Sequence, residues 1–281
     1  MSTLDPSTFF DNLTRSEDGI WRAANEERIS YPAGGHASCF AVEDNSFWFQ
    51  HRNRCIVEVV RRFAGDRRPF VDVGGGNGVV AHALQCDGFE TVLVEPGAEG
   101  AANARKRGVD HIIQATLESA GALPNRLPMV GLFDVIEHIE DSVAFLHRLR
   151  GYLHDDGVLF GTVPAYQWLW SDEDVHAGHF RRYTKESLAQ ELNGAGLRIE
   201  YVTYFFRPLI APIWALRTLP SKWSPEPRAR APEDAERDHA SESGRLSGLL
   251  GRMLAGEVGT IRRGASLSFG ASCLFAARVR D

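Results

Sequence analysis

The sequence predicts an α/β fold: a doubly wound, mostly parallel sheet of seven strands with an N-terminal helical extension. Between positions 70 and 165, short apolar segments alternate with helix-like segments of about ten residues. A glycine-rich loop follows the first apolar segment, and a glutamate ends the second. Such alternation produces parallel strands joined by right-handed crossovers. The C-terminal ends of the strands then share one edge, where ligands bind.

The first elements follow from apolar spacing and its terminators. Residues 47–63 carry apolar side chains at helical spacing, which predicts a helix that packs on the sheet. Residues 70–73 and 90–96 are predicted strands, the second stopped by Pro96. Helices are expected at 79–86 and at 99–107, where Gly108 lies just past the end. Residues 110–115 are the third strand.

The remaining elements repeat this pattern. Strands are expected at 129–135, 157–165 and 197–206. Helices are expected at 141–153, with Val143, Leu146 and Leu149 on one face, and at 184–195 and 246–261. The last strand covers 266–280, with Gly270 as a bulge.

Four segments make up the predicted domain organisation. Residues 1–46 are an N-terminal extension, and residues 47–220 form the core with the ligand site. Residues 221–245 are rich in proline and charge and are expected to be a flexible loop. Residues 246–281 add a helix and the strand that completes the sheet.

The composition limits the classes of protein to which the chain can belong. A chain of 281 residues with 43% hydrophobic and 24% charged residues suits one sizeable domain, or two at most. The formal net charge of −6 gives no general attraction for nucleic acid, so we expect no such partner. Arginine pairs occur at 61–62, 67–68 and 181–182, and a solvated face explains them better than a phosphate groove.

The sequence also indicates a cytoplasmic setting. No CxxC pair occurs among the cysteines, so we expect free thiols at Cys39, Cys55, Cys86 and Cys273. The first residues lack the basic start and apolar centre of a signal peptide. The most apolar stretch, residues 203–220, is interrupted by arginine and proline, which excludes a transmembrane segment.

The loop in "VDVGGGNG" is the strongest candidate for a ligand site. No Lys-Ser or Lys-Thr follows it, which excludes a phosphate loop. A dinucleotide fingerprint needs glycine at its sixth position, where Val79 stands. Asp72 followed by alternate glycines at 74, 76 and 78 fits a nucleoside without pyrophosphate better. The loop amides would then face an amino-acid carboxylate.

Glu95, at the end of the next strand, is placed to accept hydrogen bonds from the two hydroxyls of a ribose. NAD and S-adenosylmethionine both carry such a ribose, so Glu95 indicates an adenosine ligand without choosing between them.

A family resemblance rests on several motifs in order: "FWFQHRNR", "VDVGGGNG", "VLVEP", "LESAG", "GLFDVIEHIEDS" and "WLWSDEDVHAGHFRRYT". Together they resemble the class I S-adenosylmethionine-dependent methyltransferases. The bacterial small-molecule branch, whose fourth strand ends in a D-V-[IL]-E-H-[IV] run, is the most similar. The resemblance covers about residues 43–220 and implies a methyltransferase that uses S-adenosylmethionine as its cofactor.

The resemblance implies roles for individual residues. Asp72 and the loop glycines Gly74, Gly75, Gly76 and Gly78 would hold the methionine part of the cofactor. Glu95 would bind the ribose, and Pro96 would lie beside the adenine. The adenine edge would be lined by Thr116, Leu117 and Glu118. Phe133 and Asp134 would lie under the cofactor, and Arg52 would face the methionine carboxylate.

Methyl transfer to a hydroxyl requires loss of a proton, so a base is expected near the end of the fourth strand. The candidates are His138 and His179. In the alternative, Glu137 and His138 cap the next helix and brace the loop. A metal site made of Glu137, His138, His176 and His179 is geometrically conceivable, but no HxH or CxxC set supports it, and we expect no metal.

Two surfaces leave their roles open. Arg181, Arg182 and Tyr183 would bind an anionic acceptor or pair with the acidic residues 172–174. The aromatic residues of 201–214 are typical of a core. They also support the hypothesis of an apolar acceptor or a peripheral contact with a membrane.

The predicted function is therefore methyl transfer from S-adenosylmethionine to a small-molecule, glycan or lipid-precursor acceptor, with oxygen as the favoured atom. The alternatives are an NAD-dependent oxidoreductase and a non-catalytic nucleoside-binding protein of the same fold. The sequence does not indicate an oligomeric state.

Overall fold

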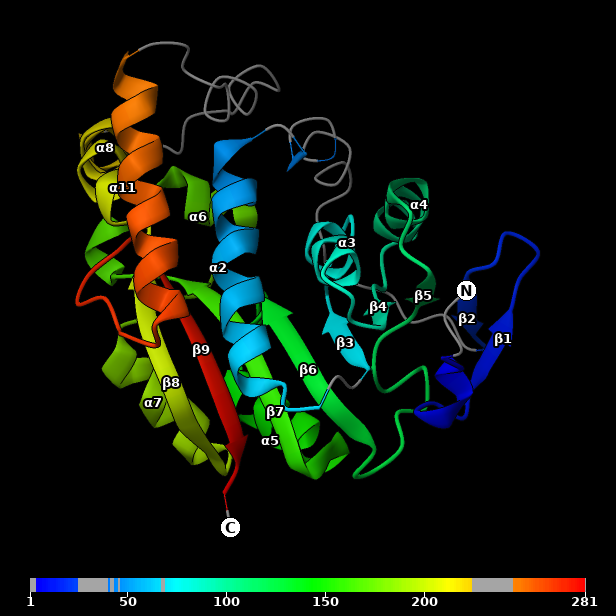
Figure 1. Cartoon of the computed structure of the whole chain (residues 1–281). Coiled ribbons are helices and arrows are strands. Elements are labelled where there is room, and N and C mark those ends of the chain that lie inside the picture. Colours follow the sequence, from blue (N-terminus) through cyan, green and yellow to red (C-terminus); the bar gives the residue numbers. More distant parts are fainter. Residues whose placement is uncertain are drawn as a thin grey trace.

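The computed structural model describes residues 4–24, 40, 43–44, 46–66, 69–223 and 245–280. Within them the chain forms one sheet flanked by helices (Figure 1). The strands are β1 Leu13–Arg15, β2 Trp21–Ala23, β3 Phe70–Val73, β4 Thr91–Val94, β5 His111–Gln114, β6 Leu127–Phe133, β7 Leu153–Pro164, β8 Leu197–Phe205 and β9 Ser272–Val279. The α-helices are α2 Phe47–Phe63, α3 Val79–Cys86, α4 Ala98–Arg107, α5 Ser142–Tyr152, α6 Asp172–Ala177, α7 Lys185–Gly194, α8 Ile210–Ile213, α9 Leu219–Trp223 and α11 Arg245–Arg262.

The sheet confirms the predicted fold class. Its strand order is β1-β2-β5-β4-β3-β6-β7-β9-β8, and the five strands from β5 to β7 in this order are parallel to their neighbours. β9 runs antiparallel between β7 and β8. All seven predicted strands occur. The order reverses beside β3, so the loop after β3 lies at the switch point of a doubly wound sheet.

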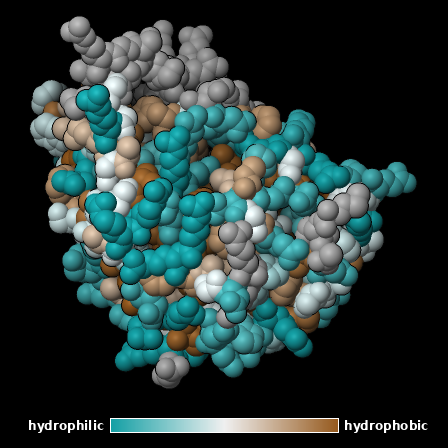
Figure 2. Space-filling model, viewed as in Figure 1, coloured by the Kyte–Doolittle hydropathy of each residue, from teal (hydrophilic) through white to brown (hydrophobic). Residues whose placement is uncertain are grey.

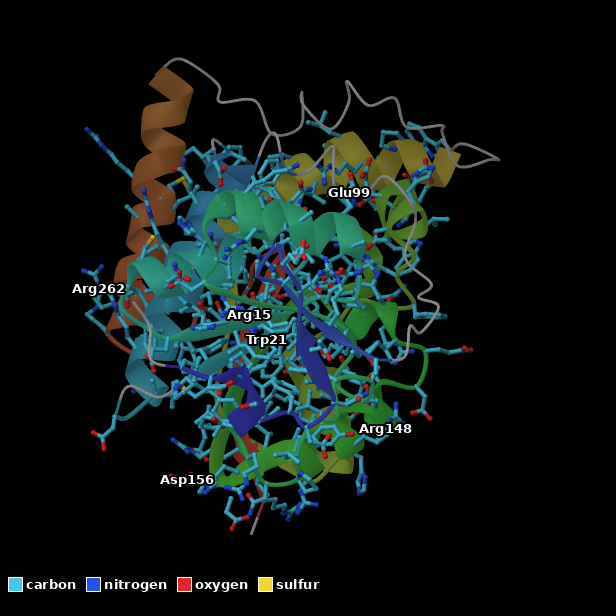
Figure 3. All side chains as sticks on the ribbon, turned by 90° about the vertical axis from the view of Figure 1, so that its right-hand side faces the viewer. Arg15, Trp21, Glu99, Arg148, Asp156 and Arg262 are labelled. Carbon is cyan, nitrogen blue, oxygen red and sulfur yellow. The ribbon has the colours of Figure 1, made fainter. Side chains whose placement is uncertain are left out.

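Two further strands come from the N-terminal extension. β1 and β2 form an antiparallel hairpin, and β2 continues the sheet in parallel with β5, where Trp21 pairs with Ile113. The Arg15 guanidinium lies 5.8 Å from the centroid of the Trp21 ring on this hairpin (Figure 3). The prediction of a helical extension is therefore wrong for residues 4–24. They contribute a short 3₁₀ turn and an edge hairpin instead.

The predicted bulge at Gly270 is also wrong. Gly270 lies outside β9, and a Cβ atom there would come within 2.1 Å of the Phe205 carbonyl oxygen. The glycine therefore permits a close approach of two backbones. The break in register lies in β8, between Ile199 and Tyr201.

The helices cover both faces of the sheet. α2, α3 and α11 bury an apolar cluster against one face, and α4 packs beside α3 on that face. α5 and α7 pack on the other face (Figure 1). The central strands β3 and β4 are buried on both sides, which explains their continuous apolar sequences. Leu146 and Leu149 of α5 enter the core, whereas Val143 is 37% exposed.

The outer face formed by α2 and α11 is mainly hydrophilic, with less polar residues gathered around α11 (Figure 2). None of the helices in the described ranges is long and apolar enough to cross a membrane. Most of the predicted flexible loop, residues 224–244, lies outside the described residues, as do Cys39 and the arginine pair at 67–68. Cys55, Cys86 and Cys273 are free thiols.

Candidate functional site

The glycine loop after β3 has a backbone that only glycine adopts easily. Gly74, Gly76 and Gly78 have φ angles of 68°, 54° and 73°. A Cβ atom on Gly75 would lie 2.4 Å from Leu93 Cδ1 and 2.5 Å from Asp72 Oδ2. The four predicted glycines therefore keep the loop bare and close to β3 and β4.

The sequence suggested that the loop amides face a ligand. Three of them instead donate to groups of the protein. The Gly74 amide donates to the Val94 carbonyl at 2.8 Å, and the Gly78 amide donates to the Gly75 carbonyl at 2.9 Å. The Gly76 amide donates to Glu95 at 2.8 Å. These three amides donate within the protein, and the expectation that the loop amides face an amino-acid carboxylate stays a prediction.

Glu95 joins the glycine loop to the start of α4. Its Oε2 accepts from the Gly76 amide, and its Oε1 accepts from the Gly97 amide at 2.6 Å. The side chain is buried, and these two bonds fix the position of its carboxylate. A carboxylate has about four lone-pair positions, so Glu95 keeps acceptor capacity for ligand hydroxyls. Pro96 follows it and is half-buried.

Beneath the loop lies Asp72, which is fully buried. Burial raises the pKa of Asp72 to about 7, against the opposing effect of the Arg52 guanidinium. Arg52 extends from α2 and pairs with Asp134 at 2.7 Å, and its buried Nε has no hydrogen-bond partner among the described residues. Asp134 directly follows β6 with a positive φ of 58° and accepts a hydrogen bond from Thr162 Oγ1. The loops after β3 and β6 thus meet around two carboxylates and one guanidinium.

A buried polar network, which sequence reasoning missed, fixes the loop from the side. Asn77 donates to Glu43 at 3.1 Å and accepts from Asn103 at 3.1 Å. Arg107 pairs with Glu43 at 2.9 Å and donates to the Asn77 carbonyl. The polar side chain of Asn77 among the loop glycines is the signal that the sequence offers for this network.

Of the residues predicted to lie near the adenine and under the cofactor, some have accessible side chains and others are buried in the core. Thr116 is half-buried and exchanges hydrogen bonds with Ser119. Leu117 is buried in the core, and Glu118 is 40% exposed and pairs with Arg148 at 3.6 Å. The Phe133 ring stacks on Phe70 in the core. The Leu117 and Phe133 side chains are thus committed to packing, and the Leu117 carbonyl accepts from the Ala122 amide at 3.0 Å.

Two histidines that are far apart in sequence meet beyond Asp134. The rings of His138 and His179 lie 4.7 Å apart, centroid to centroid, in an edge-on arrangement. Burial, together with the neighbouring His179, lowers the pKa of His138 to about 4. Glu137 is fully buried beside them, and among the residues that the structure describes both of its carboxylate oxygens lack a hydrogen-bond partner. Burial raises the pKa of this carboxyl group well above its ordinary value.

Asp174 holds His179 in place. Its Oδ1 accepts from His179 Nδ1 at 2.8 Å, and its two oxygens bind the Arg182 guanidinium at 2.7 and 2.9 Å. Although burial opposes it, hydrogen bonds from His179 and Arg182 hold the pKa of Asp174 below its ordinary value. Of the two alternatives left open for Arg182, the structure shows pairing with an acidic residue. Ser171, three residues before Asp174, forms a capping box with it, which was a readable signal.

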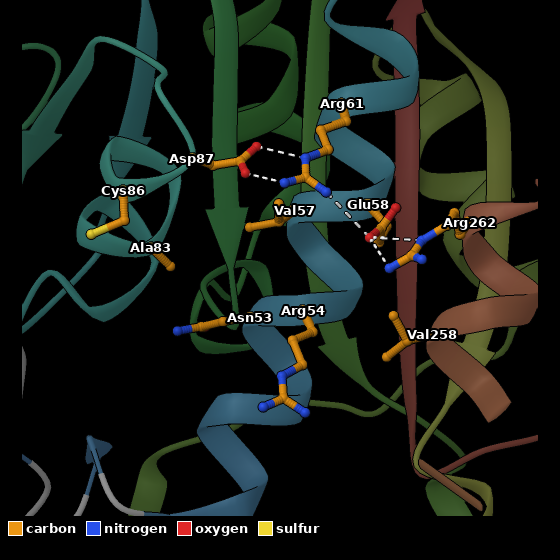
Figure 4. A pocket seen from close by; sticks show the side chains of 10 residues that line it. All are labelled: Asn53, Arg54, Val57, Glu58, Arg61, Ala83, Cys86, Asp87, Val258 and Arg262. Atoms are coloured by element: carbon orange, nitrogen blue, oxygen red, sulfur yellow. Dashed lines mark hydrogen bonds and ion pairs between the residues drawn. The ribbon is translucent and has the colours of Figure 1, made fainter. Parts of the chain in front are cut away.

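A groove in the described part of the chain lies elsewhere. It has a volume of about 430 Å³ and lies between α2, α3 and α11 (Figure 4). Arg61 pairs with Asp87 and Glu58, and Arg262 pairs with Glu58 at 2.8 Å. None of the predicted cofactor residues lines this groove, and its carboxylates are already matched by arginines. The candidate site is therefore the edge of the sheet, at the ends of β3, β4 and β6.

Comparison with known proteins identifies the family of the chain. A family model described as a methyltransferase domain matches residues 48–202, which is more than half of the chain. The ubiquinone biosynthesis O-methyltransferase of Serratia proteamaculans is 28% identical over 107 residues, which is 36% of this chain and 44% of that enzyme. The match thus spans less than half of the length of this curated relative.

Solved structures share the fold. Phosphoethanolamine N-methyltransferase 2 of Haemonchus contortus, in complex with S-adenosyl-L-methionine, superimposes with a TM-score of 0.53 at 18% identity, covering 90% of this chain and 59% of that one. The [4+2]-cyclase SpnF gives 0.53 at 16% identity, covering 89% and 86%. With the family match, the fold and the glycine loop, the chain belongs to the methyltransferase domain family and is a class I, S-adenosylmethionine-dependent enzyme.

Proposed function

We propose that the enzyme methylates an oxygen atom of a small-molecule, glycan or lipid-precursor acceptor. The observation that carries this proposal is the pair His138 and His179, which the fold brings together just beyond Asp134, with His179 oriented by a buried carboxylate. A hydroxyl acceptor needs such a group, because its proton must leave as the new bond forms. The local likeness to a ubiquinone biosynthesis O-methyltransferase supports oxygen as the methylated atom.

The residues at the sheet edge fit the proposed role of holding the cofactor. The bare loop at residues 74–78 admits a ligand close to the backbone, and Glu95 has acceptor capacity for ribose hydroxyls. Asp72 and Asp134 provide negative charge for a cationic ligand, and the unpaired Nε of Arg52 provides a donor for a carboxylate. When bound, S-adenosylmethionine supplies a methyl group that its sulfonium has already activated.

In this proposal the protein contributes position and proton handling. His179 donates its Nδ1–H to Asp174, which leaves Nε2 free to accept a proton from the acceptor hydroxyl. Holding the acceptor in line with the methyl group removes much of the entropic cost of the encounter, about 7–11 kcal/mol at best. A positioned base adds about 10²- to 10⁴-fold.

An apolar surface beside the histidines suggests the character of the acceptor. The helical residues after β8 expose Trp214, Leu216 and Trp223 by 42%, 76% and 82%. This segment is attached to the segment leading to His179, because Thr218 donates to the Leu169 carbonyl and Ser221 accepts from the Asp172 amide. Exposed apolar side chains at this place favour an acceptor with an apolar part, presented from solution or from a membrane surface.

The test is a turnover screen. The full-length enzyme is incubated with S-adenosylmethionine and matched hydroxyl and amine acceptors, with and without an alkyl chain, and S-adenosylhomocysteine release is measured. We expect turnover with hydroxyl acceptors and a preference for the alkylated member of each pair. Turnover confined to amines would contradict the proposed oxygen specificity. Equal rates with and without the alkyl chain would contradict the role of the apolar surface.

A further inference from the structure

We propose that Glu137, His138 and His179 form a binding site for one divalent transition-metal ion. One ligand atom from each residue lies within 4.8 Å of the others. The three residues come from two separate segments. Glu137 and His138 belong to the short helix Ile136–His138 after β6, and His179 follows α6. His176, which the sequence had grouped with them, is exposed and outside this cluster.

The second observation is the state of the Glu137 carboxylate. It is completely buried, and neither oxygen has a hydrogen-bond partner within the described ranges of the chain. Buried carboxylates are normally paired or bound to a metal, because leaving one unpartnered is costly. Arg52 is the nearby cation, but its guanidinium is paired with Asp134. The Phe180 amide donates to the Glu137 backbone carbonyl at 2.8 Å, which holds this residue against the segment carrying His179.

The imidazole orientations fit metal binding. His179 Nδ1 is bonded to Asp174, which leaves Nε2 as the nitrogen for a metal. A carboxylate behind a metal-binding histidine is the usual arrangement, since it fixes the ring and its tautomer. Asp174 is in turn fixed by Arg182 and by the Ser171 amide. Backbone groups of Ala177 and Gly178 provide the corresponding contact for His138.

The ligand set defines the class of metal. Two imidazoles and one carboxylate suit Zn²⁺, Fe²⁺, Co²⁺, Ni²⁺ or Mn²⁺ better than Ca²⁺ or Mg²⁺, which prefer oxygen ligands alone. Three protein ligands leave at least one position open. If the proposed function is correct, the acceptor hydroxyl binds there. A bound cation would lower the pKa of that hydroxyl. His179 Nε2 would then be a metal ligand instead of the base of the metal-free mechanism, and the proton would go to solvent.

The site is tested on the full-length protein after removal of metal with a chelator and dialysis. Calorimetric titration with Zn²⁺, and the visible absorption of added Co²⁺, measure binding. We expect one ion per chain, an affinity lowered by about tenfold or more in Glu137→Gln and His179→Gln, and by about 10- to 100-fold in Asp174→Asn. The control His176→Gln should bind like the wild type.

Two results would overturn the site: no stoichiometric binding by the wild type, or unchanged binding by Glu137→Gln and His179→Gln. Circular dichroism of each variant establishes that it is folded, and Co²⁺ absorption reports on the ligands themselves. Titration of the same metal-free protein with S-adenosylmethionine tests the cofactor site independently. The metal site and the proposed methyl transfer can therefore fail separately.

Discussion

Two regions at one edge of the sheet use different means to make a site. The glycine-loop side, residues 74–78 with Glu95, is built from backbone conformation and fixed amides. The histidine side, Glu137 and His138 with Asp174 and His179, is built from side chains that meet only in the fold. The difference teaches that the proposed cofactor site depends mainly on one contiguous loop, whereas the proposed acceptor site depends on how the segment after α6 lies against the short helix after β6.

The largest effect should come from Gly76→Val. A branched side chain at a φ of 54° would distort the loop and displace the amide that holds Glu95. We expect the affinity for S-adenosylmethionine, measured by calorimetry, to fall below detection while helix content stays the same. Gly108→Val is the matched control: its φ is 95°, nothing lies within 4 Å of its Cβ position, and it is outside the loop. Equal losses in both variants would show a general effect of backbone strain.

On the histidine side, His179→Asn should separate turnover from cofactor binding. With any acceptor that the wild type methylates, we expect the rate to fall by about 10²- to 10⁴-fold. The Kd for S-adenosylmethionine should stay unchanged, because His179 contacts neither the loop nor Glu95. Rate and Kd are measured on the same preparation, with His176→Asn as the control. A large change in Kd would mean that the two regions are one unit.

Glu95→Gln sharpens the comparison within the glycine-loop side. The amide keeps the shape of the side chain but loses the charge that strengthens its hydrogen bonds, which are worth about 1.5–3 kcal/mol each. A loss of affinity for S-adenosylmethionine of about 10- to 100-fold is expected in calorimetry. Glu99→Gln, in the exposed first turn of α4, should have no effect. If both variants bind like the wild type, Glu95 is only a structural link.

Ionisation of Asp72 should make the affinity of the glycine-loop side for the cofactor depend on pH. Because its pKa is raised to about 7, Asp72 is neutral below that pH and ionised above it. The affinity for the cationic cofactor should therefore rise as the pH increases through about 7, and Asp72→Asn should abolish this rise.

Stability without ligand should change in the opposite direction. The ordinary pKa of Asp is about 3.9, so the stability contributed by this group is complete below that pH and is lost as the pH rises towards about 7. The melting temperature of the wild type should fall over this interval relative to Asp72→Asn. Parallel curves for the two proteins would contradict the raised pKa.

The smallest effect on stability is expected at the apolar surface. Replacing Trp214, Leu216 and Trp223 by serine should change the free energy of unfolding by only about 0.5 kcal/mol per position, because these side chains are exposed. The same variant should lose the preference for alkylated acceptors. A strongly destabilised variant would show that these side chains are buried in solution and not exposed.

The contrast also explains what could be predicted from sequence. The sheet, its helices and the glycine loop could be predicted because apolar periodicity and closely spaced glycines are visible in the sequence. The structure gives these glycines positive φ angles. The hairpin of residues 13–23 was not predicted, because strands of three residues are too short to show an alternation of apolar and polar residues. His138 and His179 were candidates from their motifs, but the sequence could not give their contact across 41 positions or the exclusion of His176. The capping box at Ser171 hints at the role of Asp174.

The most direct test of the central claim is a crystal structure of the full chain with S-adenosylhomocysteine. We expect the ribose hydroxyls on Glu95, the amino-acid part beside residues 74–78, and the sulfur facing the space in front of His138 and His179. A ligand bound in the groove between α2 and α11, or a bound molecule whose sulfur faces away from the histidines, would contradict the account.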